Sequence, residues 1–153
     1  MTKLSIQIKK LNPDVVIPEY ATNGSAGFDL RAFFMDQSSV TIKSGSRAKI
    51  PTGIQMVLPE GFELQIRPRS GLAFKHGISL TNTPGTIDCD YRGEIQILMI
   101  NHGEEDFTIN HGDRIAQGVL APIYQASFTE IAELPLEESN TRLAGGFGST
   151  GVA

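Results

Sequence analysis

The most constraining feature of this chain is how closely its turn signals follow one another. The 153 residues include 16 glycines and 8 prolines, which leaves little room for long helices. Between these breakers, apolar and polar residues alternate with the two-residue period of a half-buried strand. The pattern predicts strands at 4–8, 40–42, 54–58, 62–66, 78–80, 95–100, 107–109 and 115–120. We therefore expect an all-β sandwich or barrel with one short helix, at 70–75.

Chain length indicates one domain with a distinct C-terminal end. A chain of 153 residues can bury a sizeable core, and it contains no internal repeat or linker. We expect a β-barrel domain over residues 1–136 and a C-terminal segment of the same domain over 137–153. This segment is rich in glycine and has almost no core-forming residues. One interpretation is a disordered tail; the other is a phosphate-binding loop built from free backbone N–H groups.

Composition excludes several classes of protein. The net charge of −4 and the absence of tryptophan argue against a general nucleic-acid binder. The single cysteine, Cys89, excludes an internal disulfide and favours a reducing compartment. No apolar run approaches the roughly 18 residues that a membrane span requires, and the N-terminus lacks a signal-peptide core. We expect a cytoplasmic protein with neither a nucleic-acid nor a membrane partner.

Two segments in the first half carry candidate site residues. In 25–32, Asp29 lies between apolar neighbours, where an acid is costly unless a cation is near; the structural alternatives are an ion pair with Arg31 or a hydrogen-bond acceptor in a turn. The second segment, 67–73, ends a strand and begins the short helix. Ser70 is expected to cap that helix, and a helix start beside arginine and glycine also suits a phosphate.

Two further segments lie in the second half. In 82–93, Asp88 and Asp90 point to opposite faces of an extended chain and so do not form a paired-carboxylate site. The simple interpretation is an acidic turn within a hairpin that runs into 94–100. In 112–118, Asp113 and Arg114 are most simply a turn ion pair, with Gln117 an exposed amide. No Ser/His/Asp triad and no metal-binding spacing is present.

Together these segments resemble the five ordered motifs of the trimeric dUTPase (dUTP diphosphatase) family. In order, the motifs read AGFDLRA (26–32), PRSGLA (68–73), NTPGTIDCDYRGEI (82–95), GDRIAQGV (112–119) and RLAGGFGSTG (142–151). Five motifs in sequence over nearly the whole chain are far more specific than any one of them. The chain departs from the pattern at Leu143, where a small residue is usual, and this affects the expected path of the C-terminal segment.

The resemblance implies a jelly-roll-like β-barrel subunit in a homotrimer whose three active sites are each assembled from three chains. It implies hydrolysis of dUTP to dUMP and diphosphate by attack of water on the α-phosphorus, with Mg²⁺ on the triphosphate. Such a reaction supplies the precursor of dTMP and keeps uracil out of DNA. The C-terminal segment of one chain would close over a cleft between the two others.

The resemblance also implies a role for individual residues. Asp88 would activate the attacking water, Tyr91 would pack on the deoxyribose, and Asp29 would reach the metal through water. The base would be read by Asn82, Gly85, Thr86, Ile87 and Gln96. The phosphates would be bound by Arg69, Ser70, Gly71 and Gln117, and the lid would contribute Arg142, Phe147, Ser149 and Thr150.

Two other functions are compatible with this fold. The related dCTP deaminases need a glutamate on the strand after the 82–93 segment, and Leu98 stands at that place, where it cannot transfer protons. A noncatalytic trimeric β-barrel would have no reason to combine Asp88 with a phosphate-binding segment and a glycine-rich lid. Release of diphosphate from dUTP, or of ammonia from dCTP, distinguishes these functions.

Overall fold

The computed structural model describes residues 4–135, and this part of the chain is built almost entirely from short strands. The elements are β1 (Gln7–Lys10), β2 (Phe28–Arg31), β3 (Ser39–Ile42), β4 (Arg47–Pro51), β5 (Ile54–Val57), β6 (Phe62–Arg67), α1 (Ser70–His76), β7 (Ile78–Leu80), β8 (Gly85–Ile87), β9 (Gln96–Asn101), β10 (Phe107–Asn110) and β11 (Arg114–Pro122). The expected all-β fold with one short helix is confirmed.

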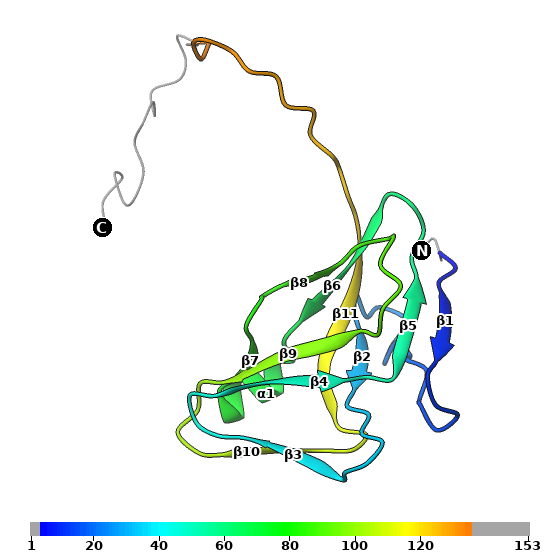
Figure 1. Cartoon of the computed structure of the whole chain (residues 1–153), viewed down its shortest axis with the longest axis vertical. Helices are drawn as coiled ribbons and strands as arrows, with labels where there is room; N and C mark the ends of the chain where they lie inside the picture. The colour runs from blue at the N-terminus through cyan, green and yellow to red at the C-terminus, as the bar shows by residue number, and fades with distance from the viewer. Residues whose placement is uncertain (1–3, 136–153) are drawn as a thin grey trace.

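All strand pairs are antiparallel and enclose one core (Figure 1). A four-stranded sheet has the order β2-β11-β6-β8, a three-stranded sheet has the order β4-β9-β7, and β1-β5 and β10-β3 form separate pairs. Alternate residues of these strands are buried, as in β6, where Leu64 and Ile66 face the core. The opposite face of β6 therefore carries Glu63, Gln65 and Arg67.

The helix begins one residue earlier than a Ser70 cap requires. Arg69 occupies the N-cap position with extended backbone angles (φ −89°, ψ 128°), and its side chain makes no capping hydrogen bond. Ser70 is the first helical residue, so the expectation that it caps the helix is wrong. The helix ends at Gly77, whose φ of 67° is the left-handed conformation that glycine adopts readily.

The expected hairpin between 82–88 and 94–100 does not form. β8 pairs with β6, with Gly85 opposite Ile66, whereas β9 pairs with β4 and β7. A Cβ on Gly85 would lie 3.3 Å from the Cβ of Ile66, so glycine permits this close approach of the two strands. The chain between β7 and β9 thus crosses to the neighbouring sheet and returns, and the peptide bond Thr83–Pro84 within it is cis.

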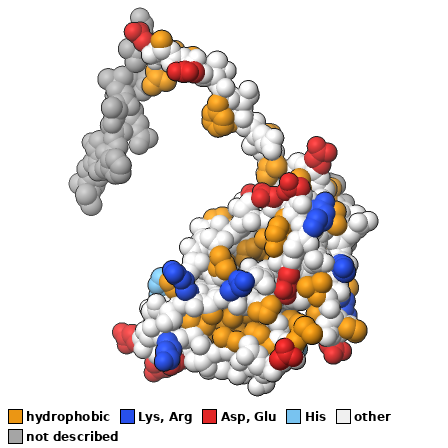
Figure 2. All heavy atoms as spheres, viewed as in Figure 1, with side chains coloured by type: hydrophobic (Ala, Val, Ile, Leu, Met, Phe, Trp, Pro, Cys, Tyr) orange, Lys and Arg blue, Asp and Glu red, His pale blue; other side chains and the backbone are white. Residues whose placement is uncertain are grey.

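The described part of the chain after β11 leaves the body of the molecule. Residues 123–135 extend away from the strands (Figure 1) and carry exposed apolar side chains, with Tyr124 97%, Phe128 94% and Leu134 79% accessible. Figure 2 shows these isolated apolar side chains, and a further group over β4 and β9 on the body. Leu98 of β9 is among the exposed residues.

No helix within residues 4–135 has the length and apolar character needed to cross a bilayer. The boundary expected at residue 136 and the segment 137–153 fall outside the described residues.

Candidate active site

One face of the β2-β11-β6 sheet carries a row of polar side chains. Asp29 of β2 lies opposite Gln117 of β11, and Gln117 lies opposite Arg67 of β6. Directly paired residues in antiparallel strands project to the same side of a sheet. With Arg69 and Arg114, which contact Asp29, this row forms a surface that we call the arginine face.

Asp29 is held by two arginines. Its Oδ1 accepts a hydrogen bond from Nε of Arg69 at 2.8 Å, and its Oδ2 accepts one from Nη1 of Arg114 at 3.2 Å. The side chain is 25% exposed, so the two cations offset the cost of half-burying a carboxylate. Pairing of Asp29 with a cation was expected from its apolar neighbours, but the partner is not Arg31, whose Nη1 donates to the carbonyl of Gly112.

The expected ion pair between Asp113 and Arg114 is also not formed. The Asp113 carboxylate accepts hydrogen bonds from the backbone N–H of Asn110, at 2.8 Å, and from its side chain. Asp113 therefore closes the turn between β10 and β11, and this leaves the Arg114 guanidinium to reach Asp29.

Gln117 is held in place on the arginine face rather than being a free surface amide. Its Nε2 donates to the carbonyl of Pro68 at 2.9 Å. On its other side lies Gly27, where a Cβ would stand 2.8 Å from Oε1 of Gln117. The absence of a side chain at Gly27 thus gives the Gln117 amide its place beside the start of α1.

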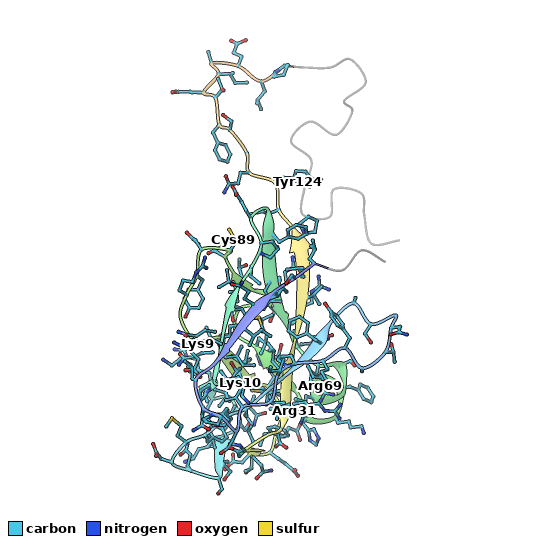
Figure 3. All side chains as sticks on the ribbon, turned by 90° about the vertical axis from the view of Figure 1, so that its right-hand side faces the viewer. Lys9, Lys10, Arg31, Arg69, Cys89 and Tyr124 are labelled. Carbon is cyan, nitrogen blue, oxygen red and sulfur yellow. The ribbon has the colours of Figure 1, made fainter. Side chains whose placement is uncertain are left out.

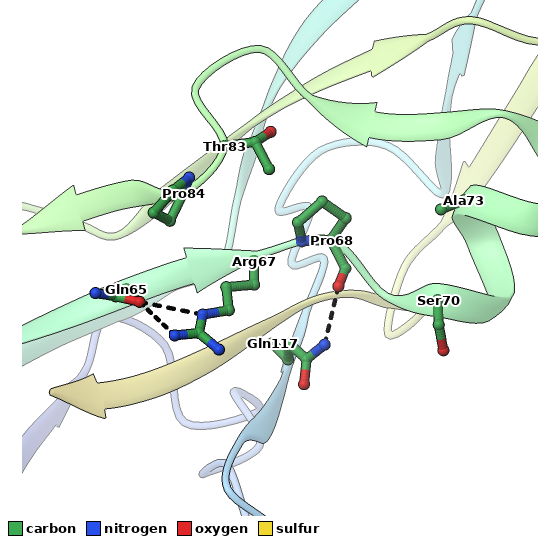
Figure 4. A pocket seen from close by; sticks show the side chains of 8 residues that line it. All are labelled: Gln65, Arg67, Pro68, Ser70, Ala73, Thr83, Pro84 and Gln117. Atoms are coloured by element: carbon green, nitrogen blue, oxygen red, sulfur yellow. Dashed lines mark hydrogen bonds between the residues drawn. The ribbon is translucent and has the colours of Figure 1, made fainter. Parts of the chain in front are cut away.

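A cavity of about 510 Å³ opens where β6 meets α1 (Figure 4). Its lining combines residues of the arginine face with the first helical turn and the beginning of residues 82–96, a segment that includes β8 and that we call the 82–96 loop. The lining residues are Gln65, Arg67, Pro68, Ser70, Ala73, Thr83, Pro84 and Gln117. In the close-up, the Arg67 guanidinium, the Gln117 carbonyl oxygen and the Ser70 hydroxyl project to the same side. Ser70 and Gly71 are both exposed at the start of α1.

The 82–96 loop carries the residues predicted to read the base. The Asn82 amide nitrogen lies 3.0 Å from the place where a Cβ of Gly85 would stand, so this side chain packs on the glycine. Thr86 is exposed opposite Gln65, and Ile87 is half-buried opposite Leu64. Asp88 follows β8 immediately and is exposed, and its carbonyl accepts a hydrogen bond from the N–H of Tyr91.

The second half of the same loop is tied to the turn between β4 and β5. Glu94 Oε1 accepts from the N–H of Gly53 at 2.7 Å, and Glu94 Oε2 accepts from Nε2 of Gln96 at 3.2 Å. The Tyr91 hydroxyl donates to the carbonyl of Glu94 at 3.0 Å, and the ring lies against Gly93. Tyr91 is thereby fixed in one orientation while 44% of it stays exposed.

The arginine face and Asp88 lie at different places on the chain. β8 runs antiparallel to β6, with Gly85 opposite Ile66 and Ile87 opposite Leu64. At ~3.3 Å per residue, this register places Asp88 roughly 13 Å along the sheet from the level of Arg67. Figure 3 shows Cys89, the neighbour of Asp88, well apart from Arg69. One chain therefore presents two partial sites, which share only the Thr83–Pro84 end of the loop.

Two arginines near the cavity were not singled out as site residues by sequence reasoning. Arg114 joins the face through Asp29, and Arg67 lines the cavity directly. The alternation of β6 places Arg67 on the outward face, but the register that brings it beside Gln117 depends on strands 50 residues apart in sequence. The predicted lid residues Arg142, Phe147, Ser149 and Thr150 lie outside the described residues.

Comparison with known proteins agrees with this arrangement. The family model described as dUTPase matches residues 14–151. A deoxyuridine 5'-triphosphate nucleotidohydrolase of Caulobacter vibrioides is 52% identical, over 97% of this chain and 96% of its own length. One from Nautilia profundicola is 54% identical, over 97% of this chain and 99% of its own. The chain belongs to the dUTPase family. It is accordingly a hydrolase of that family.

Solved structures agree in fold. The Staphylococcus bacteriophage 80alpha dUTPase with dUPNHPP superposes with a TM-score of 0.84 at 25% identity, covering 98% of this chain and all of that one. The dUTPase of phage phi11 of S. aureus superposes with a TM-score of 0.75 at 23% identity, over 85% of this chain and 98% of that one. The latter structure is described as revealing the coordination of a structural Mg(II) ion.

Proposed function

We propose that this protein hydrolyses dUTP to dUMP and diphosphate. The observation that carries the proposal is the cavity lined by Ser70, Gln117 and Arg67, with Arg69 next to Ser70 in the chain, in a protein of the dUTPase family. A triphosphate needs donors and positive charge, and a net acidic protein has to provide them locally. The product dUMP is a precursor of dTMP, and removal of dUTP keeps uracil out of DNA.

Asp88 is the general base in this proposal. Its carboxylate accepts a proton from water as the water oxygen forms a bond to the α-phosphorus. The bond from that phosphorus to the bridging oxygen breaks, and diphosphate leaves with the electron pair. The exposure of Asp88 at the end of β8 gives a water access, and the turn to Tyr91 holds the backbone.

Recognition of the nucleotide is divided between the two partial sites. Arg69, Ser70, Gly71 and Gln117 bind the phosphates from the arginine face. Asn82, Gly85, Thr86, Ile87 and Gln96 read the uracil edge, largely through backbone groups. Tyr91 packs on the deoxyribose, where a 2′-hydroxyl would clash with the ring.

The active unit is a homotrimer in this proposal. The separation of Asp88 from the arginine face supports it, because a chain that holds its own base away from its phosphate donors needs a second copy to complete the site. The exposed apolar side chains of residues 123–135 also support it, because a monomer would leave them in water. Residues 137–153 then close the site as a lid, with Arg142, Phe147, Ser149 and Thr150 contacting the nucleotide.

The donor set fits a Mg²⁺ ion that arrives on the triphosphate. Within residues 4–135 no group of three or more His, Cys, Asp or Glu side chains is arranged to hold a metal. Mg²⁺ binds readily to phosphate and water oxygens with few protein ligands. Asp29 uses each oxygen once toward an arginine and keeps a lone pair on each, so it can hold a metal-bound water. When bound, the ion neutralises charge on the phosphate oxygens.

The direct test is product analysis with purified protein. With dUTP and Mg²⁺ we expect one diphosphate released for each dUMP formed, and with dCTP no ammonia. Ammonia from dCTP would assign the chain to deamination, and binding of dUTP without any product would make it a binding module. Light scattering of the same sample is expected to give the mass of three chains of 16.6 kDa. Cell fractionation tests the expected location, and we expect to recover the protein in the cytoplasmic fraction.

A further inference from the structure

Arg67 lines the nucleotide cavity from the end of β6, but the family motif that begins at Pro68 does not include it. Its register partner is Gln117, so its side chain projects to the same side of the sheet as Gln117 and Asp29. In Figure 4 the guanidinium lies between Gln65 and the Gln117 amide, over the cavity. Arg67 is exposed, so a ligand entering the cavity meets it without any displacement of the protein.

Arg67 differs from the neighbouring arginines because its partner is not a carboxylate. Arg69 and Arg114 both contact the Asp29 carboxylate, and these are the ion pairs found within residues 4–135. Arg67 instead donates from Nε at 3.1 Å and from Nη2 at 2.5 Å to the neutral amide oxygen of Gln65. A cation held by an amide keeps its charge available for an anion.

Gln65 is itself oriented for this contact. Its Nε2 donates to Oε1 of Glu63 at 2.8 Å, which turns its carbonyl oxygen toward Arg67. Glu63, Gln65 and Arg67 follow one another on the outward face of β6. The Glu63 carboxylate thus orients the Gln65 amide, which in turn holds the Arg67 guanidinium. Within residues 4–135, Nη1 of Arg67 makes no hydrogen bond and can donate to a ligand.

We propose that Arg67, which lines this cavity, is a phosphate-binding residue in addition to Arg69 of the arginine face. The inference rests on the proposed function for the identity of the ligand, a nucleoside polyphosphate. Arg69 has committed its Nε to Asp29 and its Nη1 to the carbonyl of Arg114. Arg67 adds a guanidinium whose hydrogen bonds go to a neutral amide, and its ligands are the terminal phosphates, which carry most of the negative charge of a nucleoside triphosphate.

The test compares Arg67→Gln with Arg47→Gln. Arg47 is exposed at the start of β4, in the other sheet, and its replacement lowers the net charge equally. Dissociation constants are measured by calorimetry for dUMP, for dUPNHPP and for inorganic diphosphate. We expect Arg67→Gln to weaken dUPNHPP and diphosphate about tenfold or more, the worth of one charge-assisted hydrogen bond, while dUMP changes less than twofold. Arg47→Gln should change none of them by more than twofold.

Equal weakening of dUMP and dUPNHPP would overturn the proposal, because Arg67 would then only support the cavity. Unchanged binding of both polyphosphates in Arg67→Gln would overturn it as well. The diphosphate measurement separates this inference from the proposed function. If the wild-type protein fails to hydrolyse dUTP, the proposed function is wrong, and the loss of diphosphate affinity still decides the role of Arg67.

Discussion

At the scale of single residues, the two carboxylates proposed for the site have opposite environments. Asp29 is enclosed by two guanidiniums, whereas Asp88 stands exposed at the end of a strand. Each carboxylate oxygen of Asp29 already accepts a hydrogen bond from a guanidinium, whereas the Asp88 side chain is open to water. This contrast favours Asp88 as the base and gives Asp29 the task of organising Arg69 and Arg114.

Replacement of Asp88 tests this division. Asp88→Asn is expected to lower kcat by roughly 10² to 10⁴, the usual contribution of a general base, while the affinity for dUPNHPP stays near that of the wild type. Asp90→Asn is the matched control and should leave kcat within a few-fold. Near-normal turnover by Asp88→Asn would remove it from the mechanism.

Tyr91 offers a second test at this scale, since its ring and its hydroxyl have separable roles. Tyr91→Ala should raise kcat/KM for UTP relative to dUTP and leave the ratio of dUTP to dTTP nearly unchanged. Tyr91→Phe keeps the ring and removes only the hydrogen bond to the Glu94 carbonyl, so it should keep most of the sugar discrimination. If Tyr91→Ala relaxes sugar and base discrimination equally, Tyr91 serves only to support the loop.

At the scale of elements, close approaches between strands decide where the site side chains lie. Gly27 faces the Gln117 amide, and Gly85 lets β8 lie against β6. Glu94 fastens the 82–96 loop to Gly53, whose φ of 68° and contact with Val15 exclude a side chain there. The site residues are thus positioned by backbone packing that spans different sheets.

Gly27 provides the sharpest element-scale prediction. Gly27→Ala introduces a Cβ that would lie 2.8 Å from Oε1 of Gln117, so the amide has to move. We expect a several-fold rise in KM for dUTP with a fall in stability of less than about 2 kcal/mol, since the displaced group is a flexible side chain. Gly24→Ala, where a Cβ meets nothing within 4 Å, is the control and should change neither quantity. A normal KM for Gly27→Ala would mean that the Gln117 amide makes no contact with substrate.

At the scale of the whole molecule, a single chain keeps Asp88 apart from the arginine face and leaves part of its apolar surface exposed. The first feature is removed if copies associate so that the arginine face of one chain meets the 82–96 loop of another, and the second if residues 123–135 pack on another copy. The exposed side chains of residues 123–135 would then gain partners, which contributes ~25 cal/mol for each Å² of apolar area buried.

Truncation after Ser139 tests the role of the C-terminal segment. The removed residues contribute almost no core-forming side chains, so the truncated chain should keep its melting temperature and its trimeric mass. If the segment is the proposed lid, activity on dUTP should fall by at least an order of magnitude, because the truncated chain would lose the exclusion of water and the contacts proposed for Arg142 and Phe147. Unfolding of the truncated protein, or activity at the full rate, would show that the segment is not a lid.

Sequence alone was sufficient for the family, the all-β class and the position of the single helix. The two-residue alternation and the spacing of Gly and Pro are local properties of the sequence. They can be read without knowing which strands pair in the fold. The five motifs likewise depend only on order and spacing. The same reasoning also indicated that Asp29 needs a cation, because the cost of burying an acid beside Phe28 and Leu30 is independent of the fold.

Only the tertiary structure showed which cations contact Asp29, which strand pairs with β8 and which residues lie beside Arg67. Asp29 forms ion pairs with Arg69 and Arg114 and not with Arg31. β8 pairs with β6 and not with β9. The register between distant strands sets both contacts. Arg67 belongs to the cavity for the same reason: its partner Gln117 is brought beside it by strand pairing. Sequence spacing carries no information on such pairs, since their geometry arises from the packing of separate strands around one core.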